Sequence, residues 1–254
     1  MAKIDEYEQT LRAQEDWQPF LLEKSGLPGP RGNIELAMAF SRVGSLPDFQ
    51  KLLAENPPDL APVNSPREFL AFCGAVGLGR CLAAGDMQQI KPLRALANDP
   101  RWRTREAVCM ALQQWGDVNM DALVEEMKAW AGGSLLEQRA AAAAICEPRL
   151  LKEDHQAEPV LGILERITAA IATCEQRKTD DFSALRKGLA YCWSVAIAAY
   201  PQQGKPVFEK WLNHHDKDVR WILKQNLSKN RLVKMDANWV AKCARSLEEG
   251  SNLG

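Results

Sequence analysis

The sequence predicts an all-α protein built from about five consecutive helix pairs. Apolar residues recur with the 3.6-residue period of a helix, as in the stripe formed by Met120, Leu123, Val124, Met127 and Trp130. Stretches of alternating β-branched residues, which are typical of strands, are absent from the sequence. One pattern, an arginine near the start of a helix followed by an apolar run, returns five times along the chain.

This pattern sets the length of one structural unit. Its arginines are Arg67, Arg105, Arg139, Arg186 and Arg220, which are 38, 34, 47 and 34 residues apart. Each spacing fits a helix, a short turn, a second helix and a linker. We therefore expect helix pairs that stack on one another and not the barrel of an enzyme.

Helix starts are marked by residues that bind the first backbone amides. Ser65-Pro66-Arg67-Glu68 and Ser134-Leu135-Leu136-Glu137 both match the capping box, in which a serine and a glutamate satisfy amides that the helix leaves open. Asp99-Pro100 opens the third unit in the same style. These signals precede the arginines, so they predict where the arginine-bearing helices begin.

Two segments mark boundaries: residues 25–32, rich in proline and glycine, before the first full helix pair, and residues 56–62, rich in proline, before the Arg67 unit. Before the first of them we expect one polar helix, over about residues 3–23, that covers the apolar end of the array. Residues 1–254 are expected to form a single repeat domain. It consists of a capping helix and loop over 1–32, helical repeats over 33–247 and a frayed tail over 248–254.

The segments Asp99-Pro-Arg-Trp-Arg-Thr-Arg105 and Asp216-Lys-Asp-Val-Arg220 resemble the Asp-x-x-x-Arg core of HEAT repeats. The resemblance covers about residues 33–247 and departs from the pattern at Arg139 and Arg186, which lack an upstream Asp-Pro. It implies an α-solenoid, or α–α superhelix, in which an aspartate and an arginine bridge neighbouring repeats. The whole chain is similar to uncharacterised bacterial HEAT-repeat proteins, and this likeness implies a fold and no activity.

The overall charge is nearly balanced. With a formal net charge of −1, no field over the whole protein attracts nucleic acid or an anionic membrane. The first residues include acidic side chains and no apolar leader, and no uncharged apolar stretch is long enough to span a bilayer. The seven cysteines form no C-x-x-C pair and are expected to be reduced thiols. These features predict a cytoplasmic protein without a membrane partner.

Positive charge gathers late in the sequence. Residues 205–245 hold ten Lys and Arg against four Asp and Glu, a local net charge of +6. If a helix begins at Val219, its buried stripe consists of Val219, Ile222, Leu223 and Leu227. Another side of this helix carries Lys217, Trp221, Lys224, Gln225 and Ser228. The candidate binding residues of this basic segment are Lys217, Arg220, Trp221, Lys224, Lys229 and Arg231.

Two interpretations of the basic segment are open. The Trp221 indole could stack on a nucleic-acid base while the lysines contact phosphates. Alternatively, Trp221 packs against Trp239 or the preceding repeat, and the lysines are only solvated. Trp102, Trp130, Trp211 and Trp239 fall at corresponding helix ends, where we expect the rings to fill gaps between repeats.

HEAT-like solenoids include DNA alkylation repair glycosylases, and that resemblance implies a concave surface of arginines and tryptophans with a catalytic aspartate. The local candidate is Trp115-Gly116-Asp117, with Trp102 and Arg105 upstream. Trp115 falls on the apolar stripe of its helix, so Asp117 is more simply a residue of the turn or cap. We therefore predict no catalytic residue.

Other patterns for catalysis or metal binding are not found. His155, His214 and His215 are not spaced as a tetrahedral metal site, and the glycines of residues 74–79 lie in a helical run without the Lys-Ser/Thr of a nucleotide loop. No metal or cofactor is predicted. We expect a binding scaffold with a groove for a protein or a peptide. The alternative is a nucleic-acid-binding protein, in its most specific form a relative of the alkylation repair glycosylases.

Overall fold

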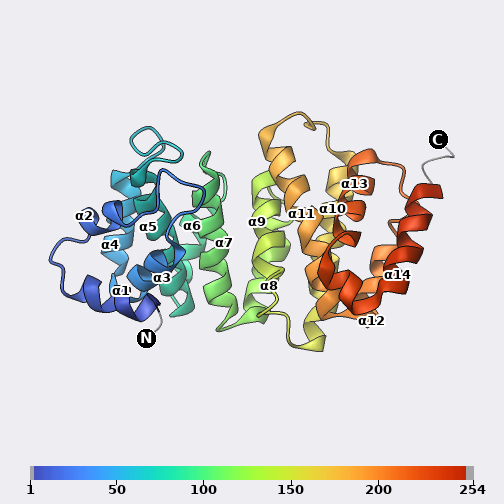
Figure 1. The fold of residues 1–254 in the computed structure, drawn as a ribbon, viewed down its shortest axis with the longest axis horizontal. Coiled ribbons are helices and arrows are strands. Elements are labelled where there is room, and N and C mark those ends of the chain that lie inside the picture. The colour runs from blue at the N-terminus through green and yellow to red at the C-terminus, as the bar shows by residue number, and fades with distance from the viewer. Residues whose placement is uncertain (1–2, 250–254) are drawn as a thin grey trace. The chain divides into compact units, whose positions relative to one another are not determined.

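The computed structural model describes residues 3–249, and within that range it contains fourteen α-helices, two short 3-10 helices and no strand (Figure 1). The α-helices are α1 (Lys3–Arg12), α2 (Gln18–Glu23), α3 (Ile34–Val43), α4 (Leu46–Glu55), α5 (Pro66–Ala83), α6 (Ile90–Leu96), α7 (Trp102–Gly116), α8 (Met120–Trp130), α9 (Leu135–Ile145), α10 (Ala157–Thr173), α11 (Asp180–Ala199), α12 (Pro201–Glu209), α13 (Lys217–Leu227) and α14 (Asn230–Glu249). The 3-10 helices are η1 (Met87–Gln89) and η2 (Asp154–Gln156). The predicted all-α class is confirmed.

The helices cluster into two compact units. The division falls between Asn119 and Met120, so α1–α7 form the first unit and α8–α14 form the second. The two proline-rich segments, residues 25–32 and 56–62, both lie inside the first unit. Of the tail expected over residues 248–254, Glu248 and Glu249 belong to α14, which corrects that boundary, and residues 250–254 lie outside the described residues.

The five repeat arginines lie where the sequence places them. Each is within the first two turns of a helix, and these helices are α5, α7, α9, α11 and α13. The even-numbered helices α6, α8, α10 and α12 alternate with them. The predicted stripe of α8, from Met120 to Trp130, is buried as a whole. No helix among residues 3–249 is long and apolar enough to cross a membrane.

The single N-terminal helix expected over residues 3–23 is in fact two helices, α1 and α2. The chain turns between Arg12 and Gln18 because Pro19 has no backbone N–H and its ring collides with the carbonyl four residues earlier. The Asp16 carboxylate accepts a hydrogen bond from the Gln18 amide at 3.1 Å. The Trp17 indole donates to the Leu11 carbonyl at 2.8 Å, which fixes the turn against the end of α1.

Helix α5 is the centre of the first unit and packs against α3, α4 and α7. Its glycines allow this close approach. A Cβ at Gly77 would lie 2.2 Å from the Phe49 ring, and one at Gly79 would lie 2.3 Å from the Ala111 Cα. The glycines of residues 74–79 therefore serve helix packing, as predicted, and form no phosphate loop.

We expect Gly79→Ala to lower the free energy of unfolding by about 1–3 kcal/mol, because the added methyl group meets the α7 backbone. Gly162→Ala in α10 is the matched substitution, since nothing lies within 4 Å of its added Cβ. It should raise the free energy of unfolding by about 0.5–1 kcal/mol. Urea unfolding of the two variants measures both effects. A stabilising Gly79→Ala substitution would contradict the packing described.

The serine half of each predicted capping box is present, and the Glu68 carboxylate accepts instead from the Asn64 amide at 2.6 Å. The Ser65 hydroxyl accepts from the Glu68 amide at 3.3 Å, and the Ser134 hydroxyl accepts from the Glu137 amide at 3.1 Å. The start of α7 differs from the prediction, because its N-cap residue is Arg101 and not Asp99. The Asp99 carboxylate instead accepts from the Arg101 amide at 2.8 Å and forms a tight turn before the helix.

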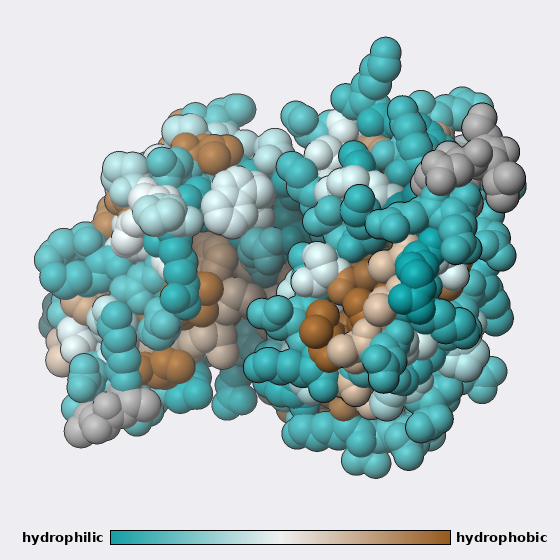
Figure 2. Space-filling view, turned by 45° about the vertical axis from the view of Figure 1, so that its right-hand side comes forward, coloured by the Kyte–Doolittle hydropathy of each residue, from teal (hydrophilic) through white to brown (hydrophobic). Residues whose placement is uncertain are grey.

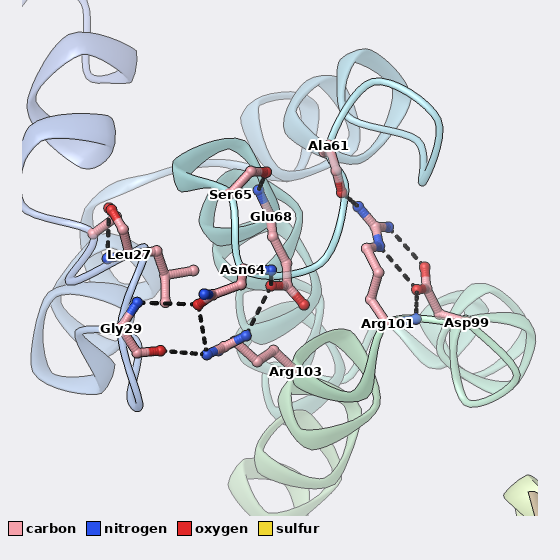
Figure 3. A network of polar contacts seen from close by, with 10 residues as sticks. Leu27, Gly29, Ala61, Asn64, Ser65, Glu68, Asp99, Arg101 and Arg103 are labelled. Carbon is pink, nitrogen blue, oxygen red and sulfur yellow. Dashed lines mark hydrogen bonds and ion pairs between the residues drawn. The ribbon is translucent and has the colours of Figure 1, made fainter. Parts of the chain in front are cut away.

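A buried ion pair holds this turn against the loop that precedes α5 (Figure 3). The Arg101 guanidinium is 2.7 Å from the Asp99 carboxylate, and both side chains are almost fully buried. Arg101 also donates to the Asn56 carbonyl at 2.9 Å and to the Ala61 carbonyl at 3.3 Å. One guanidinium thus ties the start of α7 to residues 56–61.

A second buried pair joins a further loop to the same helix (Figure 3). Arg103 is 3.1 Å from the Glu68 carboxylate, which is fully buried, and it donates to the Gly29 carbonyl at 2.7 Å. Arg103 also donates to the Asn64 side chain at 3.1 Å, and Asn64 has a positive φ of 66°. The arginine therefore connects α5, α7 and the loop over residues 25–32.

The turn of α7 exposes Trp102, which was expected to fill a gap between repeats. Its neighbours Arg101 and Arg103 both point inward, so the indole between them is 44% exposed, with the Arg103 guanidinium 4.3 Å from its ring. Trp130 and Trp239 are buried, and the filling of gaps between repeats stays a prediction for them. Trp211 is partly buried and stacks near the His214 ring, with 5.5 Å between the two ring centres.

We expect Arg103→Met to lower the free energy of unfolding by about 3–5 kcal/mol, because it leaves the fully buried Glu68 without its cation. Arg12→Met is the control, since the Arg12–Glu8 pair lies on the surface, and its effect should stay below about 1 kcal/mol. Urea unfolding measures both variants. If both variants lose the same free energy of unfolding, burial does not make the Glu68–Arg103 pair more important for stability than a surface pair.

Helix α11 is the centre of the second unit and lies between α9 and α13 (Figure 1). The buried Asn226 side chain joins α13 to it. Its Oδ1 accepts from the Ser194 amide at 2.8 Å, and its Nδ2 donates to the Leu189 carbonyl at 2.8 Å. A further bond runs from the Trp193 indole to the Thr168 hydroxyl of α10 at 3.0 Å. These bonds fix the register of three helices in the core.

Candidate functional site

Helix α13 carries most of the candidate binding residues. It begins at Lys217, two residues before the predicted start at Val219, because Asp216 is its N-cap residue. The predicted buried stripe of Val219, Ile222, Leu223 and Leu227 is confirmed. Lys217, Lys224 and Ser228 are exposed and Trp221 and Gln225 are partly exposed, so the other predicted side of the helix faces away from the core.

A pocket of about 410 Å³ lies between α13 and α14. Its lining consists of Lys217, Arg220, Trp221, Lys224, Leu227, Ser228, Val240, Ala244, Leu247 and Glu248. Four of the six predicted binding residues are therefore brought together at one place. Figure 2 shows apolar side chains gathered within a hydrophilic surround on the second unit, the right-hand part of the view.

Lys229 and Arg231 do not line the pocket. The Arg231 guanidinium stacks on the Tyr191 ring of α11, 4.5 Å from its centre, and also bonds the Tyr191 hydroxyl. The Lys229 amide donates to the Asn226 carbonyl at 3.0 Å in the turn between α13 and α14. The six residues proposed from the sequence as one site thus separate into a pocket and a neighbouring turn.

The Trp221 indole packs on a side chain of α11, the preceding arginine-bearing helix. The Arg186 guanidinium of α11 lies 3.9 Å from the centre of its ring. Trp239, the other predicted neighbour, instead packs on Phe208, with ring centres 5.8 Å apart. One face of the Trp221 ring is therefore covered by a cation, and a base or an apolar group could reach only the other face.

The carboxylate of Asp218 positions Arg186 for this contact. Asp218 is only 5% exposed and forms ion pairs with Arg186 at 3.1 Å and with Arg177 at 2.8 Å. The hydrogen bond that Arg177 donates to the Asp218 carboxylate raises the pKa of Arg177, so the guanidinium stays charged. The Arg186–Asp218 pair connects α11 to α13, which are consecutive arginine-bearing helices.

Arg220 links the two helices that form the pocket. Its guanidinium donates to the Leu247 carbonyl in the last turns of α14, and it lies 3.5 Å from the His214 carbonyl before α13. A long basic side chain thus supports the floor of the pocket through backbone contacts. Arg105, at the corresponding place in α7, likewise donates to the Asp99 and Pro100 carbonyls, at 2.7 and 2.9 Å.

The pocket has the composition of a binding site. Trp221, Leu227, Val240, Ala244 and Leu247 supply apolar walls, and the exposed ammonium groups at its rim belong to Lys217 and Lys224. Its hydroxyl, from Ser228, donates to the Gln225 carbonyl at 2.8 Å. The lining therefore offers apolar contact and positive charge.

The other chemical candidates are accounted for by structure. Among residues 3–249, no group of three or more His, Cys, Asp and Glu side chains is arranged to hold a metal ion. His214 Nδ1 accepts from the Asp216 amide at 3.1 Å, and His155 lies 2.9 Å from the Asp121 carboxylate. Trp115 is buried in the core and Asp117 is the C-cap residue of α7, as expected for a helix end.

The sequence interpretation missed the contribution of α14. Val240, Ala244 and Leu247 recur at intervals of four and three residues, which places them on one side of the helix. This spacing can be found in the sequence. The start of the segment that carries it is less evident, because α14 has non-helical backbone angles at Asp236, where two helical segments meet. The Asp236 carboxylate caps the second segment through the Trp239 amide at 2.9 Å and binds Lys205 at 2.6 Å.

No protein-family model matches the chain, and neither a curated protein nor a solved structure matches it with significant similarity. The resemblance to HEAT repeats therefore rests on the residues of the sequence and stays a prediction.

We expect the free energy of unfolding to fall in acid partly through Asp216. Burial would raise the pKa of Asp216, but hydrogen bonds from the Val219 amide and from Arg177 outweigh it and lower the pKa. A lowered pKa contributes stability that is full above the unfolded value, near pH 4, and is lost as the pH falls through the folded value.

Asp216→Asn keeps a cap oxygen and removes the charge that meets Arg177. The variant should therefore be less stable than the natural chain by about 1 kcal/mol at pH 7, and the difference should shrink below about pH 4. Urea unfolding at pH 7 and pH 3 measures it. A difference that is the same at both pH values would rule out a charge effect.

Proposed function

We propose that this chain is a non-catalytic binding protein of the HEAT-like solenoid type, and that it binds a protein or a peptide in the pocket between α13 and α14. The repeat part of this proposal is supported by the alternation of arginine-bearing and partner helices. It is also supported by the Arg186–Asp218 pair, because the resemblance implies an arginine and an aspartate that bridge neighbouring repeats. A cytoplasmic location belongs to the same proposal, and the unpaired cysteine thiols fit it.

The observation that carries the binding function is the composition of the pocket. Apolar side chains from two helices form its walls, and two flexible lysines stand at its rim. Apolar anchors that enter such a pocket provide most of the affinity of a protein interface, while charges at the edge select the partner. Nothing in the lining combines a nucleophile, a base and a site for a reacting group.

Nucleic-acid binding is the second candidate, and the local charge of residues 205–245 favours it. Three contacts work against it. Arg186 covers one face of Trp221, Arg231 is stacked on Tyr191, and Arg220 bonds backbone carbonyls. Two of the five candidate cations, Arg220 and Arg231, and one face of the Trp221 ring are therefore used within the protein.

Peptide display on the purified chain, followed by fluorescence anisotropy with the selected peptides, tests this function. Ala244→Glu places a charge in the pocket and should weaken the selected peptides at least about tenfold, because it adds a charge to an apolar wall. Ala241→Glu is the matched control, since Ala241 is exposed on α14 and does not line the pocket. It should leave binding unchanged.

The same titration with labelled single- and double-stranded DNA decides between the two candidates. We expect no DNA binding at about 150 mM salt. Tight DNA binding that falls steeply with salt, and that is lost in a Lys217→Glu/Lys224→Glu variant, would replace peptide binding by nucleic-acid binding.

A further inference from the structure

The proposed binding function leads to a sharper statement about the partner. We propose that the segment that occupies the α13–α14 pocket is an acidic amphipathic helix. Its apolar stripe lies along the groove between the two helices, and its carboxylates pair with Lys217 and Lys224. Three features of the second unit lead to this inference: the repeat itself, the spacing of the lining residues and the charge at the rim.

Helix α11, the arginine-bearing helix before α13, shows what covers the surface that corresponds to the pocket side of α13. Arg186 of α11 and Arg220 of α13 are corresponding arginines, 34 residues apart. The same shift takes Ala190 and Ser194 of α11 to Lys224 and Ser228 of α13. On α11 this side is buried, and the Ser194 amide bonds Asn226 of α13 at 2.8 Å. The element that covers it there is an α-helix.

On α13 the corresponding side is open. Lys224 and Ser228 are both exposed, and both line the pocket. Helices in a stacked array present similar surfaces at similar intervals, so a surface that one helix covers in one repeat has a shape that suits a helix in the next. A helix of a partner fits this place, because an amphipathic helix that lays its apolar side in an apolar groove is a recurring mode of recognition.

The spacing of the lining residues has the helical period on both walls. Lys217, Trp221, Lys224 and Ser228 follow one another at intervals of four, three and four residues on α13. On α14, Val240, Ala244 and Leu247 follow one another at intervals of four and three residues. Two such ridges enclose a groove that a third helix fills with side chains at positions i, i+4 and i+7. The α13 wall spans about 16 Å, or three turns of a partner helix.

The charge of the lining selects the sign of the partner. The pocket carries the three cations Lys217, Arg220 and Lys224 against the single anion Glu248. In the described part of the chain, no carboxylate forms an ion pair with Lys217 or Lys224, whereas Lys205 pairs with Asp236 and Lys210 with Glu165. Both ammonium groups are exposed and can turn towards carboxylates that flank an apolar stripe.

A set of synthetic peptides tests the inference. The first is an alanine-based helix of about four turns with leucines at i, i+4, i+7 and i+11 and with flanking glutamates. The second has lysines in place of these glutamates. The third has the composition of the first, with two central alanines replaced by prolines so that no helix forms. Each peptide carries a fluorophore, and anisotropy at about 150 mM salt gives its dissociation constant.

We expect the acidic helix to bind about tenfold more tightly than the basic helix, and the proline peptide to bind about tenfold more weakly than the acidic helix. Lys217→Glu/Lys224→Glu should reverse the preference, so that the basic helix binds more tightly. The matched variant is Lys234→Glu/Lys242→Glu, which changes two exposed lysines of α14 that do not line the pocket. It should keep the preference of the natural chain.

The outcomes separate this inference from the binding function on which it rests. Equal binding of the acidic and basic helices, or a preference that the Lys217/Lys224 variant does not reverse, overturns the acidic partner. Equal binding of the proline peptide overturns the helical partner. If none of these peptides binds while display-selected peptides bind and Ala244→Glu weakens them, the inference is wrong and the binding function stands. If no selected peptide responds to Ala244→Glu, both are wrong.

Discussion

The position of α13 on α11 depends on a buried carboxylate that two arginines share. Asp218 meets Arg177, which lies before α11, and Arg186, which lies within it, and its neighbour Asp216 meets Arg177 as well. Burial of apolar side chains along α13 supplies most of the free energy of packing. Apolar contacts alone would still allow α13 to shift along α11. The ion pairs and the Asn226 hydrogen bonds prevent this shift, because it would leave buried charges and amides without partners. The site follows from this, since α13 is held with Trp221 under Arg186 and its lysines towards solvent.

The first unit uses the same principle with different residues. Arg101 and Arg103 reach from the start of α7 into two loops, and their partners Asp99 and Glu68 are buried with them (Figure 3). A buried ion pair contributes little net stability compared with apolar groups of the same volume, so its main effect is to specify one loop arrangement. In both units, then, arginines near helix starts determine how neighbouring segments meet.

The mixed apolar and cationic lining of the pocket has a structural cause. The pocket lies between two helices whose most apolar sides are buried in the core of the second unit. Val219, Ile222 and Leu223 face the core of the second unit, so the side that α13 turns towards α14 carries an indole, lysines and Leu227. Helix α14 contributes the small and aliphatic residues Val240, Ala244 and Leu247, and the pocket is the space between these residues and α13. A surface that is apolar in its centre and cationic at its rim can retain a partner through burial and choose it by charge.

The sequence by itself determined the all-α class, the five arginine-bearing helices, the serine caps of α5 and α9 and the buried stripe of α13. These features are local: a helical period, a cap and a proline act within a few residues, so their effect can be inferred without the rest of the chain. Only the tertiary structure decided which distant residues meet. It placed Arg231 on Tyr191 and Arg186 on Trp221, it brought α14 to the side of α13, and it exposed Trp102 by turning both flanking arginines inward. Such contacts join residues that lie tens of positions apart, or depend on them. They are settled by how buried charges and apolar surfaces are satisfied together across the whole core, which no short stretch of sequence contains.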